Sequence, residues 1–156
     1  MNQVSELKDL LGRRTWDKEV VLWLGSEPTL KELLAQWNAT ELDLLDLFDP
    51  NDLPSDDDVT RKVLTRAIRS RLQDLRASAG SRIILVVRSC GLLARYGLGL
   101  KDFYDWFCGD FGMVVLPLAC PADNTRWPES ILFEKDRLFK YFSETGMCSR
   151  IVTDKG

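Results

Sequence analysis

Apolar and polar positions follow two different periods along this chain, and the two periods predict strands and helices in turn. Residues 19–24 form a run of strand length that is apolar on both parities and stops at Gly25. Residues 82–88 and 113–116 repeat this pattern. A strand that is apolar on both parities is buried on both faces, which is typical of a parallel sheet covered by helices.

Between these runs the apolar residues recur every three or four positions, which predicts helices. The expected helices cover residues 5–12, 29–37, 58–77 and 137–142, with a further helical stretch around 103–107. Weaker strand patterns lie at residues 42–48 and 131–133, and the tail at 148–153 is predicted as an edge strand. The segment that starts at Asp49 is predicted as a loop, because prolines and aspartates crowd it.

Strands that alternate with helices predict a three-layer α/β fold with a mainly parallel sheet. The chain has 156 residues, of which 45% are hydrophobic, and this suits a single domain over residues 1–156. No apolar run approaches the roughly 20 residues that a membrane span needs, and the first residues lack a basic-then-apolar leader. We therefore expect a cytoplasmic protein without a membrane partner.

Histidine is absent from the sequence, which excludes whole classes of chemistry. Serine–histidine and cysteine–histidine nucleophile pairs, histidine bases and two-histidine zinc motifs all need an imidazole. The four cysteines, Cys90, Cys108, Cys120 and Cys148, include no Cys-x-x-Cys pair. We therefore expect no bound metal and interpret the thiols as small buried apolar groups.

A net charge of −3 conceals a separation of the charges along the chain. Residues 41–58 carry eight carboxylates and no cation, and the next helix begins with Arg61, Lys62, Arg66 and Arg69. Carboxylates at the start of a helix and cations further along complement its dipole, so Asp56, Asp57 and Asp58 are interpreted as capping residues. A face that binds phosphate or nucleic acid is the alternative interpretation.

The loop after the first long strand partly matches a Walker A phosphate loop, Gly-x-x-x-x-Gly-Lys-Ser/Thr. Gly25 and Lys31 occupy the positions of the first glycine and the lysine. Leu30 replaces the second glycine, and Glu32 replaces the hydroxyl that holds magnesium. Two of the four fixed positions therefore match.

Two further residues also oppose phosphate chemistry in this region. Glu27 places a negative charge inside the loop. Arg88 follows the apolar strand 83–87, at the position where a Walker B aspartate would hold the metal. If the architecture is that of a phosphate-loop NTPase, both catalytic elements are lost.

The segments 83–100, 103–107 and 113–117 resemble the second half of small P-loop-like proteins of bacteriophage-exclusion (BREX) defence systems. The resemblance covers about half of the chain and lies in the pattern of strands and helices more than in identical residues. It implies a degenerate phosphate-loop fold and a role beside other subunits of a defence complex. It also implies neighbouring genes for a large ATPase, a methyltransferase and a phosphatase-like protein.

Several residues are candidates for binding a partner. Arg88 and Arg95 lie past a central strand and could bind phosphate, a partner carboxylate, or an acidic residue of this chain. Trp127 lies in a proline-bounded loop, where it would either anchor a partner or cover the domain's own surface. The aromatic residues between 103 and 111 fit core packing better than base stacking.

The leading hypothesis is a non-enzymatic, cofactor-free protein-interaction subunit of a phage-defence complex. Its candidate partner-binding residues are Arg88, Arg95 and Trp127. The alternative is a nucleotide or nucleic-acid binder, with Gly25, Lys31 and Arg88 as candidate phosphate contacts. A carboxylate-dependent nuclease is a third class, for which Asp43 and Asp46 are the sole strand-end acids.

Overall fold

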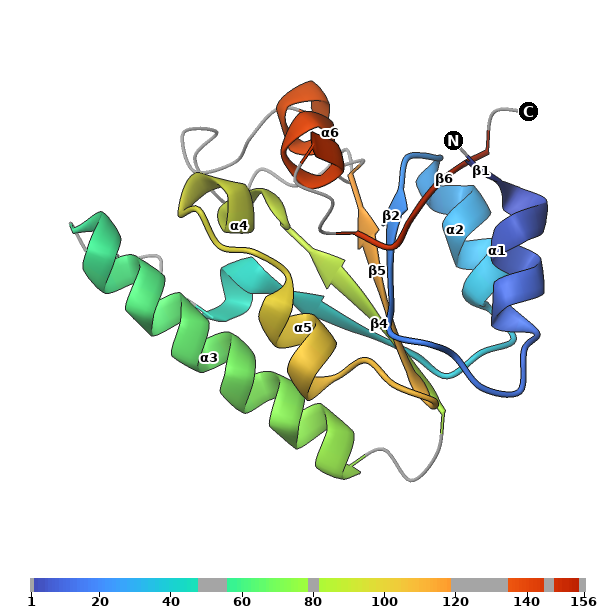
Figure 1. Ribbon diagram of the computed structural model, residues 1–156, viewed down its shortest axis with the longest axis horizontal. Helices are drawn as coiled ribbons and strands as arrows, with labels where there is room; N and C mark the ends of the chain where they lie inside the picture. Colours follow the sequence, from blue (N-terminus) through green and yellow to red (C-terminus); the bar gives the residue numbers. More distant parts are fainter. Residues whose placement is uncertain (1, 48–55, 79–81, 119–134, 145–147, 155–156) are drawn as a thin grey trace.

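The computed structural model describes residues 2–47, 56–78, 82–118, 135–144 and 148–154, and its sheet is parallel throughout (Figure 1). The strands are β1 (Asn2–Gln3), β2 (Glu19–Trp23), β3 (Ala39–Asp43), β4 (Ile83–Arg88), β5 (Gly112–Pro117) and β6 (Arg150–Thr153). The helices are α1 (Val4–Leu11), α2 (Glu27–Leu34), the 3₁₀ helix η1 (Leu44–Leu47), α3 (Asp57–Ser78), α4 (Gly91–Arg95), α5 (Lys101–Trp106) and α6 (Lys135–Glu144).

The strand order is β1-β6-β2-β5-β4-β3, so the three most apolar strands lie together in the middle. β2 pairs with β5 in a register that places Val20 beside Val114, and β5 pairs with β4. Every residue of β2 and β5 is buried, as the continuous apolar runs predict.

Helices cover both faces of this sheet and make the three-layer α/β fold that the sequence predicts (Figure 1). α1 and α2 pack on one face, against alternate residues such as Val21 and Val115. α3, α4, α5 and α6 pack on the other face, against Val20 and Val114. Each layer therefore has its own apolar core, with the sheet between them.

The interpretation of Asp56, Asp57 and Asp58 as capping residues is confirmed for Asp56, whereas Asp57 and Asp58 lie in the first turn of α3. The Asp56 carboxylate accepts hydrogen bonds from the backbone N–H of Asp58 at 2.8 Å and of Val59 at 3.4 Å. The buried stripe of the helix includes Leu64 and Ile68. Val63, although apolar and next to Leu64, lies outside this stripe and is 42% exposed.

The prediction of one strand over residues 42–48 was wrong. The strand β3 ends at Asp43, and the 3₁₀ helix η1 follows. The Asp43 carboxylate accepts a hydrogen bond from the N–H of Leu45 at 3.0 Å, a local turn that ends the strand. Leu44 and Leu45 are buried as expected, although they lie in a helical turn.

The prediction that the tail forms an edge strand was also wrong. β6 lies between β2 and the two-residue strand β1, and it pairs in parallel with both. A strand as short as β1 carries no periodicity, so the sequence could not reveal this outer neighbour.

Some expectations concern residues that lie outside the described part of the chain. These are the loop that starts at Asp49, the strand at 131–133, Cys120 and Trp127. Among the described residues, no helix is both long enough and apolar enough to cross a bilayer.

Candidate functional site

The carboxyl edge of the central strands is the place where this fold positions a site. β2 leads into α2 on one face of the sheet, while the chain that leaves its neighbour β5 reaches α6 on the other face. Adjacent strands whose connections diverge in this way leave a crevice beyond their carboxyl ends, where α/β proteins bind ligands. The loop at Gly25 lies at this point, directly after β2.

Gly25 is needed here because the space beside its backbone is already filled. A Cβ at this position would lie 2.4 Å from Cζ2 of Trp23 and 2.8 Å from Cγ of Asp154. The indole Nε1–H of Trp23 donates a hydrogen bond to the Ser26 carbonyl at 3.1 Å. This glycine therefore lets the loop pack closely against the chain's own side chains, as a phosphate-loop glycine would pack against a phosphate.

The Asp154 carboxylate accepts the hydrogen bond of the backbone amide at the start of α2. The Ser26 N–H donates a hydrogen bond to Oδ2 of Asp154 at 2.8 Å, although the two residues are 128 positions apart. The Ser26 hydroxyl caps α2 by accepting from the Thr29 N–H at 3.4 Å. Hydrogen bonds from the Ser26 backbone, then from the Ser26 and Thr29 side chains, hold the pKa of Asp154 below its ordinary value.

Arg88 is held by two carboxylates on the same face of the sheet. Its guanidinium forms an ion pair with Glu27 in the first turn of α2. It also pairs with Glu41 of β3, with Nη2 at 2.8 Å from Oε1. Burial by itself would lower the pKa of the Arg88 guanidinium, but hydrogen bonds to Glu27 and Glu41 raise it above its ordinary value.

Glu27 and Arg88, whose charges oppose the binding of phosphate and of magnesium, thus neutralise each other. Glu27 would repel a phosphate and Arg88 would repel a magnesium ion, yet the ion pair between them joins the start of α2 to the end of β4. The side chain of Arg88 is 13% exposed and that of Glu27 is 23% exposed. Removal of Arg88 would leave the largely buried Glu27 carboxylate without its cation, whereas removal of Glu27 would leave Arg88 paired with Glu41 alone.

Leu30 and Lys31 occupy the positions of the second glycine and the lysine of a Walker A loop, but one is buried and the other is exposed. Leu30 is 1% exposed and belongs to the apolar core beneath α2. Lys31 and Glu32 lie on exposed positions of α2. Because residues 27–34 are already helical, Leu30 and Lys31 form a helix turn at the positions where a phosphate loop would still wrap its ligand.

Ser89 adds local strain at the same edge of the sheet. It directly follows Arg88 and has a positive backbone φ of 58°, a conformation that residues other than glycine rarely adopt. Its buried Oγ has no hydrogen-bond partner among the described residues. Strained residues of this kind gather where a fold builds functional geometry, so the end of β4 belongs to the candidate site.

Arg95 lies further along, at the end of α4, and is tied to α3. Its Nη1 lies 3.2 Å from Oδ2 of Asp57, and its guanidinium lies 5.1 Å from the ring centre of Tyr96. Both side chains of the Arg95–Asp57 pair are substantially exposed, so this pair adds little to stability. Arg88 and Arg95 therefore both contact carboxylates of the acidic segment 41–58.

The four basic residues at the start of α3 divide into two kinds. Arg61 donates hydrogen bonds to the carbonyls of Tyr96 and Gly97, and Arg69 pairs with Asp102 at 2.9 Å. Lys62 and Arg66 are exposed and have no acidic partner among the described residues. Half of the basic face is therefore used for packing α3 against the neighbouring segments.

The aromatic group around α5 is split between core and surface. Phe103 and Phe107 are each 1% exposed, which confirms core packing for these two. Trp106 and Phe111 are 44% and 49% exposed. Phe103 packs into the core from α5, and Phe107 packs there from the position just after the helix ends at Trp106.

A second polar cluster, which the sequence did not indicate, lies at the amino edge of the sheet. Glu19 is buried and pairs with Nε of Arg150 at 2.7 Å, and it accepts from the Ser149 hydroxyl at 3.0 Å.

Burial raises the pKa of Tyr104 and of Cys108 to about 12. A thiol with such a pKa is protonated at neutral pH. Cys90 is buried, as expected of the thiols, whereas Cys108 and Cys148 are partly exposed.

Asp154 and Glu41 are the site residues that sequence reasoning missed. Asp154 is far from the loop in sequence and belongs to no motif, and Glu41 was counted only as part of an acidic segment.

No protein-family model matches the chain, and a comparison with curated proteins finds no match either.

Proposed function

We propose that this chain is a non-catalytic subunit that works by binding another protein. The observation that supports the proposal is the ion pair between Glu27 and Arg88, which uses both residues of the phosphate-loop region internally. Asp154 likewise takes the Ser26 amide that a phosphate would otherwise use. The resemblance of residues 83–117 to BREX proteins makes a phage-defence complex the proposed assembly.

The first test asks whether the chain binds or hydrolyses a nucleotide. A fluorescent ATP analogue with magnesium would be titrated against the wild-type protein, and phosphate release from ATP would be followed in parallel. We expect no saturable binding and no hydrolysis, because a nucleotide would have to displace Asp154 and meet Glu27 at the start of α2.

Lys31→Ala is the diagnostic variant, and Lys62→Ala is its matched control. Both lysines are exposed, but Lys31 alone occupies the phosphate-loop position. Hydrolysis in the wild type that Lys31→Ala abolishes and Lys62→Ala preserves would overturn the proposal. Unchanged behaviour of all three proteins, with no turnover, agrees with it.

The second test addresses the partner directly. We expect the protein to co-elute in size exclusion with at least one product of its neighbouring genes, co-expressed from separate plasmids with a tag on the neighbour. If the resemblance holds, these genes encode a large ATPase, a methyltransferase and a phosphatase-like protein. Elution of the chain as a free species beside every neighbour would contradict the interaction role.

A second candidate function is nucleic-acid binding through α3, which Lys62 and Arg66 favour because they are exposed without acidic partners among the described residues. Two phosphate contacts predict a salt slope of only about −2 in log affinity against log salt concentration. DNA titrations at two salt concentrations, with a Lys62→Ala/Arg66→Ala variant, test this candidate. Binding that neither salt nor the variant weakens would exclude this surface.

A further inference from the structure

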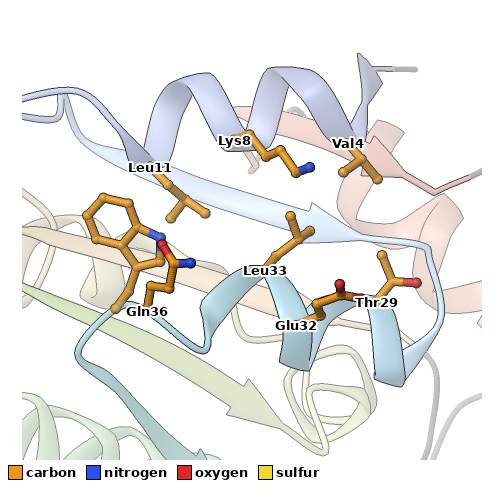
Figure 2. A pocket seen from close by; sticks show the side chains of 8 residues that line it. Val4, Lys8, Leu11, Thr29, Glu32, Leu33 and Gln36 are labelled. Atoms are coloured by element: carbon orange, nitrogen blue, oxygen red, sulfur yellow. The ribbon is translucent and has the colours of Figure 1, made fainter.

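A groove of about 420 Å³ lies between α1 and α2, on the face of the sheet opposite α3 (Figure 2). α1 contributes Val4, Lys8 and Leu11 to one wall. The other wall comes from α2 and the residues just after it, and it is lined by Thr29, Glu32, Leu33, Gln36 and Trp37. Apolar and polar side chains thus share one elongated surface feature.

The spacing of these residues shows that each helix presents one stripe to the groove. Val4, Lys8 and Leu11 follow the offsets of zero, four and seven that place residues on one face of a helix. Thr29 and Leu33 are likewise four positions apart on α2. Two parallel ridges with a groove between them are the surface against which a third helix packs.

The groove also carries one charge of each sign on opposite walls. Lys8 belongs to α1 and Glu32 to α2, and neither has an ion-pair partner among the described residues. Figure 2 shows the Lys8 side chain directed toward the space between the two helices. The groove is therefore complementary to a ligand that has an apolar centre, a negative charge toward α1 and a positive charge toward α2.

We propose that the α1–α2 groove binds an amphipathic helix of the partner protein. The apolar ridge of that helix lies on Val4, Leu33 and Trp37, which are the partly exposed apolar residues of the groove, with an acidic residue beside Lys8 and a basic residue beside Glu32. α1 and α2 have eight residues each, or about 12 Å, which matches a partner segment of two to three turns. The inference rests on the proposed interaction function and names the surface that performs it.

Three synthetic helical peptides with the same leucine ridge would serve as probes. One peptide has an acidic and a basic flank, one has two acidic flanks, and one has two basic flanks. Each would be titrated into ¹⁵N-labelled protein, and the amide signals of α1 and α2 would be followed. We expect the wild type to prefer the mixed peptide by about two- to fivefold for each charge that is matched.

Charge-reversal variants change this preference in a way that does not depend on peptide direction. Lys8→Glu makes both walls acidic, so it should prefer the basic peptide. Glu32→Lys makes both walls basic, so it should prefer the acidic peptide, and the double variant should return to the mixed one. Lys31→Glu is the matched control, because Lys31 lies on α2 but does not line the groove.

Several results would overturn the proposal. These are peptides that shift no amide signal of α1 or α2, preferences that follow overall charge in Lys31→Glu as well, and preferences that the groove variants leave unchanged. Shifts of α1 and α2 that depend on protein concentration without peptide would assign the groove to a second copy instead. Co-elution with a gene neighbour that survives both reversals would retain the interaction function and move it to another surface.

Discussion

Asp154 shows how one side chain can decide what a loop is able to bind. Its carboxylate accepts the Ser26 N–H at 2.8 Å, and this hydrogen bond favours the ionised form. The loop thereby keeps an anion at the start of α2, but the anion belongs to the chain itself. A phosphate-loop position can therefore retain its geometry and still have its binding amide occupied.

The lowered pKa of Asp154 predicts a pH-dependent contribution to stability. Because the folded state binds its proton more weakly than the unfolded state, the contribution is full above the ordinary pKa of 3.8 and is lost as the pH falls through the lowered one. We expect Asp154→Asn to be less stable than the wild type at neutral pH and to approach it in acid. Urea unfolding across a pH series measures this difference.

Asp105→Asn is the control for that series. Asp105 is an exposed carboxylate on α5 without a hydrogen-bond partner among the described residues. Its replacement should leave the unfolding free energy unchanged at neutral pH. A stability difference for Asp154→Asn that persists unchanged in acid would show that its carboxylate charge is not responsible.

Gly25→Ala is expected to destabilise the protein by about 1–3 kcal/mol, because the new methyl group would overlap Trp23 and Asp154. Gly109→Ala is the matched control, since a Cβ there meets no atom within 4 Å. Chemical denaturation of both variants measures the difference. Equal stability of the two alanine variants would contradict the close packing at Gly25.

At the scale of single elements, α3 and β3 show what a pattern can and cannot predict. The helix α3 could be predicted because its buried residues Leu64, Ile68 and Leu72 recur every four positions over a long segment. The leucines at residues 44 and 45 were read as a strand, because a short apolar run indicates burial rather than backbone conformation. The Asp43 side chain accepts a hydrogen bond from the Leu45 N–H, and this bond favours a helical turn over a strand at residues 44 and 45.

The cap of α3 gives a prediction at this scale. Asp56→Ala removes an acceptor for the N–H groups of Asp58 and Val59, and it should cost about 1 kcal/mol of unfolding free energy. Asp74→Ala, an exposed change within the same helix, should cost much less. Thermal unfolding followed by circular dichroism compares the two, and equal losses would show that the cap contributes nothing particular.

At the scale of the whole molecule, the sequence predicted the layers and the parallel sheet but not the contacts that complete the candidate site. Gly25 and Arg88 were located correctly near strand ends, because Gly25 follows the buried strand β2 and Arg88 ends the buried run of β4. The partners in this region could not be predicted in the same way, since Glu27 pairs with Arg88 across 61 residues and Asp154 accepts from Ser26 across 128. Contacts of this length depend on strand order, which hydrophobic period does not encode.

The link between β2 and β6 predicts the largest stability effect. Arg150→Leu leaves the buried Glu19 with its Ser149 hydrogen bond but without its cation, and we expect a loss of about 3 kcal/mol. The double variant Glu19→Gln/Arg150→Leu should recover most of this loss, because it also removes the buried charge. Urea denaturation gives both values, and equal losses in the single and double variants would contradict this account.

The position of β6 beside β2 also has a consequence for synthesis of the chain on the ribosome. Glu19 meets Arg150, which is made 131 residues later. At about 5–20 residues per second, β2 waits on the order of ten seconds for this neighbour. During that interval one edge of this mostly apolar strand is unpaired, so a chaperone that shields nascent chains should bind the first half of this protein until translation passes β6.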